Sequence, residues 1–282
     1  LALRQQYFGA DATTRYSSGS PGNTGDGVQA GVQAGAATDL LDDAWWAPTF
    51  MPAGGAPQIV IFDRGKPGNI IVNTAGERFA NEALPYNELV KQMQEADQSG
   101  PSAIPAFMIF DDTYRSRYPL GALLPGVTPE KYIESGFITR CTTVAELAQQ
   151  MGIDAAGLQA TVARFNAMAA RGVDEDYQRG ESAFDRFSGD PAVGPNCCLA
   201  PLEKPPFYAM RLYPGDLGTK GGLLTNAHAQ VVNDTGQPIR GLYAAGNSSA
   251  SIMGNYYPGA GGTIGPAMTL GYLAAMHAAA HG

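Results

Sequence analysis

The sequence has 282 residues and a formal net charge of −8, which argues against binding to a nucleic-acid backbone because such binding needs a concentrated basic face. Its 44% hydrophobic and 16% charged residues, with 36 glycines and 20 prolines, are typical of a globular enzyme rich in tight turns and exclude a disordered chain. The three cysteines and three histidines provide neither a disulfide framework nor the spacing of a metal site.

We therefore expect no bound metal and a reducing compartment, the cytoplasm. The sequence contains no run of about 18 apolar residues, and its start lacks the apolar segment of a signal peptide. A soluble protein is expected, with association at a membrane as the alternative. The length favours two packed units over one.

In the first half of the chain, a stretch of small residues leads into apolar positions at helical spacing, which predicts a helix through Val28, Val32, Ala36 and Leu40. The β-branched runs at 58–65 and 69–76 flank a Lys-Pro-Gly-Asn turn and predict a hairpin. The segment 105–119 predicts a buried strand followed by a short helix that ends at Pro119.

In the second half, residues 142–152 and 154–172 predict two helices, each with an N-capping side chain and a glycine at its C-terminal end. The Pro-rich segment 173–205 lacks periodicity and predicts an extended surface connection. A strand at 205–214 and short strands within 221–247 follow, and residues 263–282 predict a last helix.

The segment 241–265, GLYAAGNSSASIMGNYYPGAGGTIG, joins a strand to this last helix through seven glycines. Glycine at this density lets the backbone approach a flat or charged ligand, and free N–H groups at a helix start can face an electron-rich acceptor. The pattern alone leaves two interpretations open, a ligand site and a tight structural crossover.

Several motifs resemble the 3-ketosteroid dehydrogenases, within the fumarate reductase and succinate dehydrogenase flavoprotein superfamily. They occur in the same order and cover nearly the whole chain, as NTGDGVQAG, GERFANEALPY, VDEDYQRG, GTKGGLLTN, GQPIRGLYAAGN and NYYPGAGGTIGPAMTLGY. The resemblance implies FAD as cofactor and an oxidoreductase that removes two hydrogens from a carbon–carbon bond beside a ketone.

The resemblance also implies roles for individual residues. Tyr86, in NEALPY, matches the tyrosine that removes the α-proton, and Tyr257 with the N–H of Gly261 matches the pair that holds the substrate's C3 carbonyl. The implied cofactor contacts are Gly25, Asp26, Gly27, Gly246, Asn247, Gly262, Thr263, Ile264 and Gly265. We expect Tyr256 to point away from the site and pack.

These roles agree with the chemistry of desaturation. Hydride leaves an unactivated carbon only if the neighbouring carbon loses a proton, and that proton becomes acidic when the ketone oxygen is polarised. One phenol can donate to the developing oxyanion, and another can act as base if its pKa falls from about 10.

The sequence departs from the family in one respect, because it has no GxGxxG motif after a first strand and no acidic residue following it. We therefore expect an α/β fold with an α+β cap: the C-terminal part of a Rossmann-like FAD-binding domain with an inserted catalytic domain, and with the N-terminal βαβ unit absent. The expected parts are FAD-binding segments at 1–46 and 219–282 and a catalytic cap at 47–218. The missing N-terminal FAD-binding segment, as further sequence or another chain, is an expected partner.

The expected activity is 1,2-desaturation of a 3-ketosteroid or similar hydrophobic ketone. Two alternatives stay open: a 4-dehydrogenase acting on a 5α-reduced 3-ketosteroid, and a cofactor-free fragment that binds a steroid or a partner chain without turnover.

Overall fold

The computed structural model describes residues 1–281, and the chain forms a mixed α/β structure of two compact units. Unit 1 comprises residues 1–46 and the chain from Asp216 onward, and unit 2 comprises residues 47–215. Within residues 1–281, none of the helices combines the length and hydropathy that a membrane crossing requires.

Unit 2 is built on a six-stranded sheet with the order β3-β2-β7-β5-β4, in which β6 also pairs with β7. The pairs β2–β3, β4–β5, β5–β7 and β6–β7 are antiparallel. The strands are β2 (Ala44–Phe50), β3 (Gln58–Ile59), β4 (Asn69–Val72), β5 (Ala106–Phe110), β6 (Thr139–Cys141) and β7 (Phe207–Thr219). The chain passes between the two units within β2 and at the end of β7.

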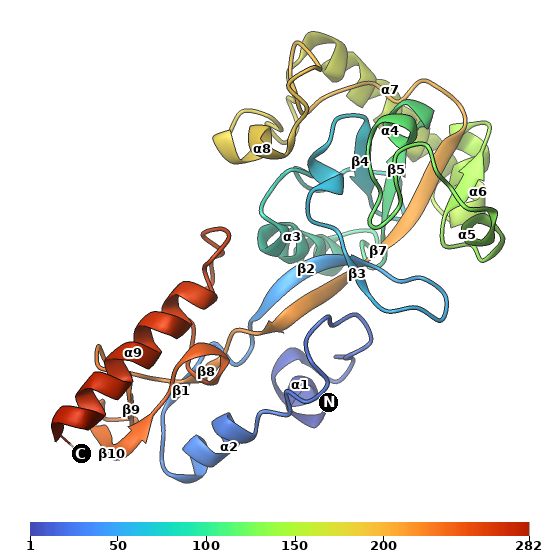
Figure 1. The fold of residues 1–282 in the computed structure, drawn as a ribbon. Helices are drawn as coiled ribbons and strands as arrows, with labels where there is room; N and C mark the ends of the chain where they lie inside the picture. Colours follow the sequence, from blue (N-terminus) through green and yellow to red (C-terminus); the bar gives the residue numbers. More distant parts are fainter. Residues whose placement is uncertain (282) are drawn as a thin grey trace. The chain divides into compact units, whose positions relative to one another are not determined.

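Helices cover both faces of this sheet (Figure 1). Alternate strand residues such as Ile70 and Ile109 pack with α6 (Val144–Met151) and α7 (Ala155–Arg171). Their neighbours, such as Ile71 and Met108, pack with α3 (Tyr86–Ser99) and α4 (Asp112–Arg117). Because both faces are buried, β5 is apolar throughout and β4 is apolar after Asn69, without alternation. The short helices are η1 (Asp63–Gly65), α5 (Glu130–Glu134) and α8 (Ala183–Ser188).

Unit 1 has a much smaller apolar core, formed around Leu223, Val231 and Ala244. Two short antiparallel pairs, β1–β8 and β10–β9, are its sheets. Its elements are α1 (Ala2–Phe8), α2 (Asp26–Gln33), β1 (Thr38–Asp39), β8 (Gly222–Leu223), β9 (Gln230–Val232), β10 (Pro238–Tyr243), η2 (Gly246–Ser248) and α9 (Ile264–His281).

Several predicted elements in both halves of the chain are confirmed. Thr143 and Glu146 form a capping box at the start of α6, Asp154 caps α7, and both helices end at left-handed glycines. The strand at 106–110, the helix that follows it and the last helix are also present.

Three predictions are wrong. The helix predicted through Val28 to Leu40 ends at Gln33, where Gly35 takes a positive φ and the chain turns into β1. The hairpin at 58–76 does not form, because β3 pairs with β2 and β4 pairs with β5. The segment 173–205 is not an extended surface connection, since it contains α8 and buries Asp174, Arg179 and Asp185.

Those buried side chains belong to an ion network in the interior of unit 2. Arg78 binds Glu82 at 2.7 Å and Asp174 at 2.8 Å, and Arg179 binds the other oxygen of Glu82 at 3.0 Å. Burial alone would raise the pKa of the Glu82 carboxyl, but Arg78 and Arg179 hold it below its ordinary value. The network therefore joins the segments around residues 78–82 and 174–179 through charges that are removed from water.

We expect Glu82→Gln to lower the free energy of unfolding by about 3–5 kcal/mol, because two buried guanidinium groups lose their shared counter-charge. The matched control is Glu130→Gln, whose carboxylate is 61% exposed and pairs with Arg140 on the surface. That change should cost less than about 1 kcal/mol. Urea denaturation of both variants measures the difference, and equal effects would contradict the role given to the network.

Candidate functional site

Tyr86 is the first residue of α3 and is 8% exposed, in unit 2. The chain that leads to it is fixed by the buried Arg64, which donates to the carbonyl oxygens of Glu82 and Leu84. Asn81 adds a 3.0 Å bond to Asp185. Burial, with repulsion from Arg179, lowers the pKa of Arg64 to about 9. Tyr86 therefore follows a segment whose backbone and side chains are both anchored.

Two other tyrosines of unit 2 are committed to structural bonds. Tyr114 donates its phenol to the carbonyl oxygen of Asp63 at 2.9 Å, and Tyr118 donates to the Asp190 carboxylate at 2.7 Å. Burial raises the pKa of both phenols, and the bond to Asp190 raises that of Tyr118 further. Both groups stay protonated at neutral pH, which makes them poor general bases.

Tyr257 lies in unit 1 at the start of the glycine-rich loop that precedes α9. Its ring is half-buried and meets the ring of Trp45 edge-on, with centroids 6.0 Å apart. Tyr256 is 74% exposed, so the expectation that it packs is wrong. Gly259 and Gly261 have φ values of +129° and +90°, which L side chains rarely adopt. Glycine is therefore required for this path of the loop.

The residues predicted to bind the cofactor come together within unit 1, where η2 contacts α9. A Cβ atom at Gly27 would lie 3.2 Å from the Ser248 hydroxyl, which places the start of α2 against η2. A Cβ at Gly246 would lie 3.5 Å from the Cβ of Ala267, which places η2 against α9. The other predicted residues flank these contacts at the helix starts and in η2: Gly25 and Asp26, Asn247, and Gly262, Thr263, Ile264 and Gly265.

This arrangement leaves open space at the start of α9. Added Cβ atoms at Gly261 and Gly265 would meet nothing within 4 Å, and Thr263, Ile264 and Gly265 are exposed. The first N–H groups of a helix have no partner within the helix and carry partial positive charge. A flat, electron-rich ring such as a flavin fits the exposed surface that the glycines leave open here.

The sequence reasoning gave no role to Lys220, which is 2% exposed and lies next to Asp43 and Trp45. The signal available was the motif GTKGGLLTN, in which a lysine precedes two glycines. A lysine in a polar, glycine-rich segment is normally exposed, so composition did not mark it.

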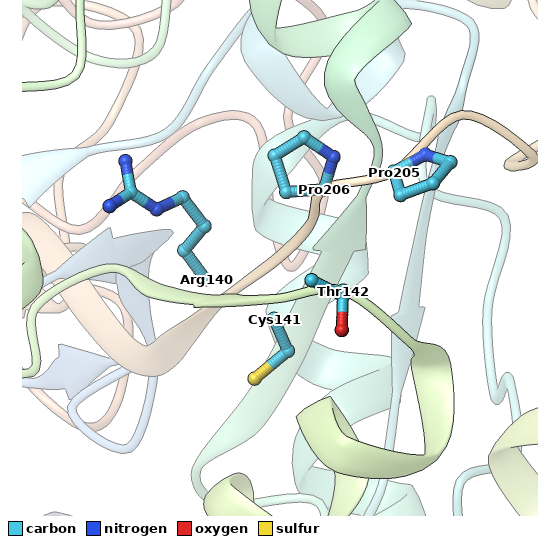
Figure 2. Close-up of a pocket in the computed structure, with 5 residues that line it drawn as sticks. All are labelled: Arg140, Cys141, Thr142, Pro205 and Pro206. Carbon is cyan, nitrogen blue, oxygen red and sulfur yellow. The ribbon is translucent and has the colours of Figure 1, made fainter.

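Two hollows lie elsewhere, in unit 2. One of about 400 Å³ is lined by Arg140, Cys141, Thr142, Pro205 and Pro206 (Figure 2), and one of about 410 Å³ lies beside the 52–58 loop. Burial and the nearby Glu146 raise the pKa of the Cys141 thiol, which disfavours the nucleophilic thiolate. Neither hollow includes a predicted site residue.

The three histidine rings lie together, His277 and His281 in the last turns of α9 and His228 beside them. The His277 ring lies 4.9 Å from that of His228 and 4.3 Å from that of His281, and its Nδ1 is 2.8 Å from the Tyr243 hydroxyl. Burial and the neighbouring rings lower the pKa of His277. Across residues 1–281, no group of three His, Cys, Asp or Glu side chains has an arrangement that could hold a metal ion.

Comparison with known proteins identifies the family. A family model described as "FAD binding domain" matches residues 3–264. The chain belongs to this FAD-binding domain family, and the FAD predicted from the sequence is the cofactor of that family.

Among curated proteins, the chain is 50% identical to "3-oxosteroid 1-dehydrogenase" of Mycobacterium tuberculosis, over 98% of this chain and 50% of the relative. It is 42% identical to "4-oxocyclohexanecarboxylate 2-dehydrogenase" of Sinomonas cyclohexanicum, over 90% of this chain and 45% of the relative. The resemblance to ketosteroid dehydrogenases is confirmed, and the chain spans about half the length of these relatives.

A solved structure agrees with the sequence matches. The 3-ketosteroid delta1-dehydrogenase from Sterolibacterium denitrificans, in complex with 1,4-androstadiene-3,17-dione, superposes with a TM-score of 0.95 at 45% identity. The match covers 100% of this chain and 51% of that one. The fold of this chain is therefore that of the corresponding half of a flavoprotein dehydrogenase.

The two open glycines allow backbone strain to be separated from side-chain space. We expect Gly261→Ala to cost about 1–2 kcal/mol of stability, because its φ of +90° is unfavourable for any L residue. Gly265→Ala should be neutral or stabilising, since it lies in the first turn of α9 with open space at its Cβ. Urea denaturation followed by tryptophan emission compares the two, and an equal loss would contradict the loop geometry.

Proposed function

We propose that this chain provides the catalytic part of a FAD-dependent dehydrogenase that desaturates the C1–C2 bond of a 3-ketosteroid. The observation that carries the proposal is the segment 257–265, where a phenol, an open glycine loop and a helix start follow one another in unit 1. The 50% identity to 3-oxosteroid 1-dehydrogenases supports the substrate class. The smaller cyclic ketone in the name of the Sinomonas relative supports the same bond chemistry beside a ring carbonyl.

In this proposal the residues of the chain divide the work. Tyr86 removes the proton at C2, and the Tyr257 hydroxyl and Gly261 N–H donate to the C3 oxygen as negative charge develops there. Bound FAD supplies the acceptor for the hydride from C1. Gly25, Asp26, Gly27, Gly246 and Asn247 hold the cofactor through backbone and small side chains. The helix start at Gly262, Thr263, Ile264 and Gly265 lies beneath its pyrimidine ring, where the positive end of the α9 dipole stabilises negative charge.

The comparisons favour this reaction over the two alternatives. A 4-dehydrogenase would introduce a double bond at C4–C5, on the other side of the ketone. The ultraviolet spectrum of the product distinguishes a C4–C5 double bond from a C1–C2 double bond. A cofactor-free binding fragment is disfavoured by the FAD-binding domain match over residues 3–264. Flavin absorbance in the purified protein tests that alternative directly.

The exposed face of α9 supports a further FAD-binding segment as partner. Ile264, Met268, Tyr272 and Met276 recur every four residues and are 55–70% exposed, so they form one apolar stripe along the helix. We propose that the part of the FAD-binding domain expected to carry the pyrophosphate loop packs on this stripe. Location in the cytoplasm, and association with a membrane surface, stay predictions.

Tyr86→Phe in the full-length holoenzyme should keep flavin and steroid affinity but lose turnover. The change removes the phenol oxygen and little volume, and loss of a general base costs about 10²–10⁴ in rate. Stopped-flow flavin reduction measures the effect. A rate within a few-fold of wild type would reassign Tyr86 to packing.

Tyr257→Phe should slow flavin reduction far more than it weakens steroid binding, because charge on the ketone oxygen develops only during reaction. Loss of one such donor costs about 3–4 kcal/mol in transition-state stabilisation. The same change should slow exchange of the C2 hydrogens with deuterated solvent, a step that needs enolisation but no hydride transfer. Unchanged exchange, measured by mass spectrometry of recovered steroid, would show that another group polarises the ketone.

A further inference from the structure

Lys220 is a buried lysine that the proposed mechanism does not use. It lies in the turn between β7 and β8, and its side chain is 0% exposed. Its ammonium group is 3.3 Å from the Asp43 carboxylate, 3.0 Å from the carbonyl oxygen of Tyr256 and 4.7 Å from the centroid of the Trp45 ring. A buried ammonium group is costly unless it is paired, so these contacts account for its position.

The backbone around Lys220 is as closely packed as its side chain. Lys220 donates its N–H to the Asp43 carbonyl at 3.0 Å, and its own carbonyl accepts from Ser251 at 3.1 Å. At the adjacent Gly221, a Cβ atom would lie 2.4 Å from the Leu40 carbonyl oxygen. Only glycine permits this close approach. Lys220 thereby lies between the segment around Asp43 and the segment from Ser251 to Tyr256.

Asp43 is itself fixed in orientation. Its Oδ1 accepts from the Ala44 N–H at 2.8 Å and from the Trp46 ring N–H at 2.9 Å, while Oδ2 faces Lys220. The counter-charge of the ammonium group therefore has a defined place, and both tryptophans of the chain contact this pair.

Two of these contacts connect Lys220 to Tyr257, one through the backbone and one through the Trp45 ring. The carbonyl that accepts from Lys220 belongs to the peptide group joining Tyr256 to Tyr257. This hydrogen bond therefore fixes the orientation of the peptide plane that precedes the Cα atom of Tyr257. The Trp45 ring that the ammonium group contacts also meets the Tyr257 ring edge-on. The residues after Tyr257 include Gly259 and Gly261, both at positive φ.

We propose that Lys220 is a positioning residue, which fixes the Tyr256–Tyr257 peptide and the Trp45 ring so that the Tyr257 phenol stays directed at the ketone oxygen. This inference rests on the proposed role of Tyr257. It assigns the lysine of GTKGG to the site that holds the substrate carbonyl, without contact between the lysine and the substrate.

The test uses the full-length holoenzyme with 3-fluorotyrosine at position 257, so that the ¹⁹F signal reports the ring's surroundings independently of turnover. Lys220→Met, which keeps the length of the side chain and removes its charge, should shift or broaden the signal. It should also slow flavin reduction by about 10-fold or more, because small misplacements of a positioned group cost up to about 10² in rate. Steroid affinity should change by less than the rate.

The rate effect should not add to that of Tyr257→Phe. If Lys220 acts through the Tyr257 hydroxyl, the double variant should reduce flavin no more slowly than Tyr257→Phe alone. A lysine that only stabilises the fold would give additive losses. Lys204→Met is the matched control, since that lysine pairs with Asp112 but is 65% exposed, and it should leave both readouts unchanged.

Asp43→Asn provides a second variant if Lys220→Met fails to fold, because it is isosteric and still offers an acceptor to Trp46. It should move the ¹⁹F signal in the same sense. An unchanged signal in the folded Lys220 or Asp43 variant overturns the proposal, as does a moved signal with a normal rate when Tyr257→Phe is slow. If Tyr257→Phe itself is normal, the role of Tyr257 in the proposed function fails, while the ¹⁹F signal still decides whether Lys220 holds the ring.

Discussion

The carboxylate of Glu82, shared between Arg78 and Arg179, is the interaction on which unit 2 depends. A buried charge requires its partners at hydrogen-bond distance. The network therefore holds Glu82 and Arg179 together, although they are 97 residues apart in the sequence. Four residues beyond Glu82, the chain begins α3 with Tyr86. The position of the candidate base therefore follows from electrostatics in the core as well as from apolar packing.

Unit 1 differs from unit 2 in how its structure is stabilised. Its apolar core is small, and the surfaces assigned to the cofactor are made of backbone and glycine. Such a loop has little side-chain packing to hold it, and its glycines cost conformational entropy on ordering. The buried pair of Lys220 and Asp43 supplies a fixed point beside this loop. The pair holds one end of the glycine-rich loop in a defined position, while the loop stays open to a flat ligand.

Local signals predicted what local interactions determine. The caps at Thr143 and Asp154 and the apolar run at 106–110 specified α6, α7 and β5 from the sequence. The predicted hairpin does not form because strand partners depend on contacts distant in sequence. The segment 173–205 is not an exposed connection because Asp174 and Arg179 are buried as ion-pair partners of Arg78 and Glu82. The glycines predicted to bind the cofactor were assigned through the family resemblance. Lys220 was not, since burial of a lysine depends on partners that arrive from residues 43–45 and 256.

The discontinuous composition of unit 1 determines the order in which the protein can assemble. Arg4 pairs with Asp216, 212 residues later, and Asp43 meets Lys220 after 177 residues. Synthesis proceeds at roughly 5–20 residues per second, and the continuous unit 2 is complete before Asp216 and Lys220 have been made. Trp45 gains its contacts with Lys220 and Tyr257 only after those later residues have been made. Because β2 and β7 are neighbours in the sheet, folding of unit 2 pairs the strands that lead into the two parts of unit 1.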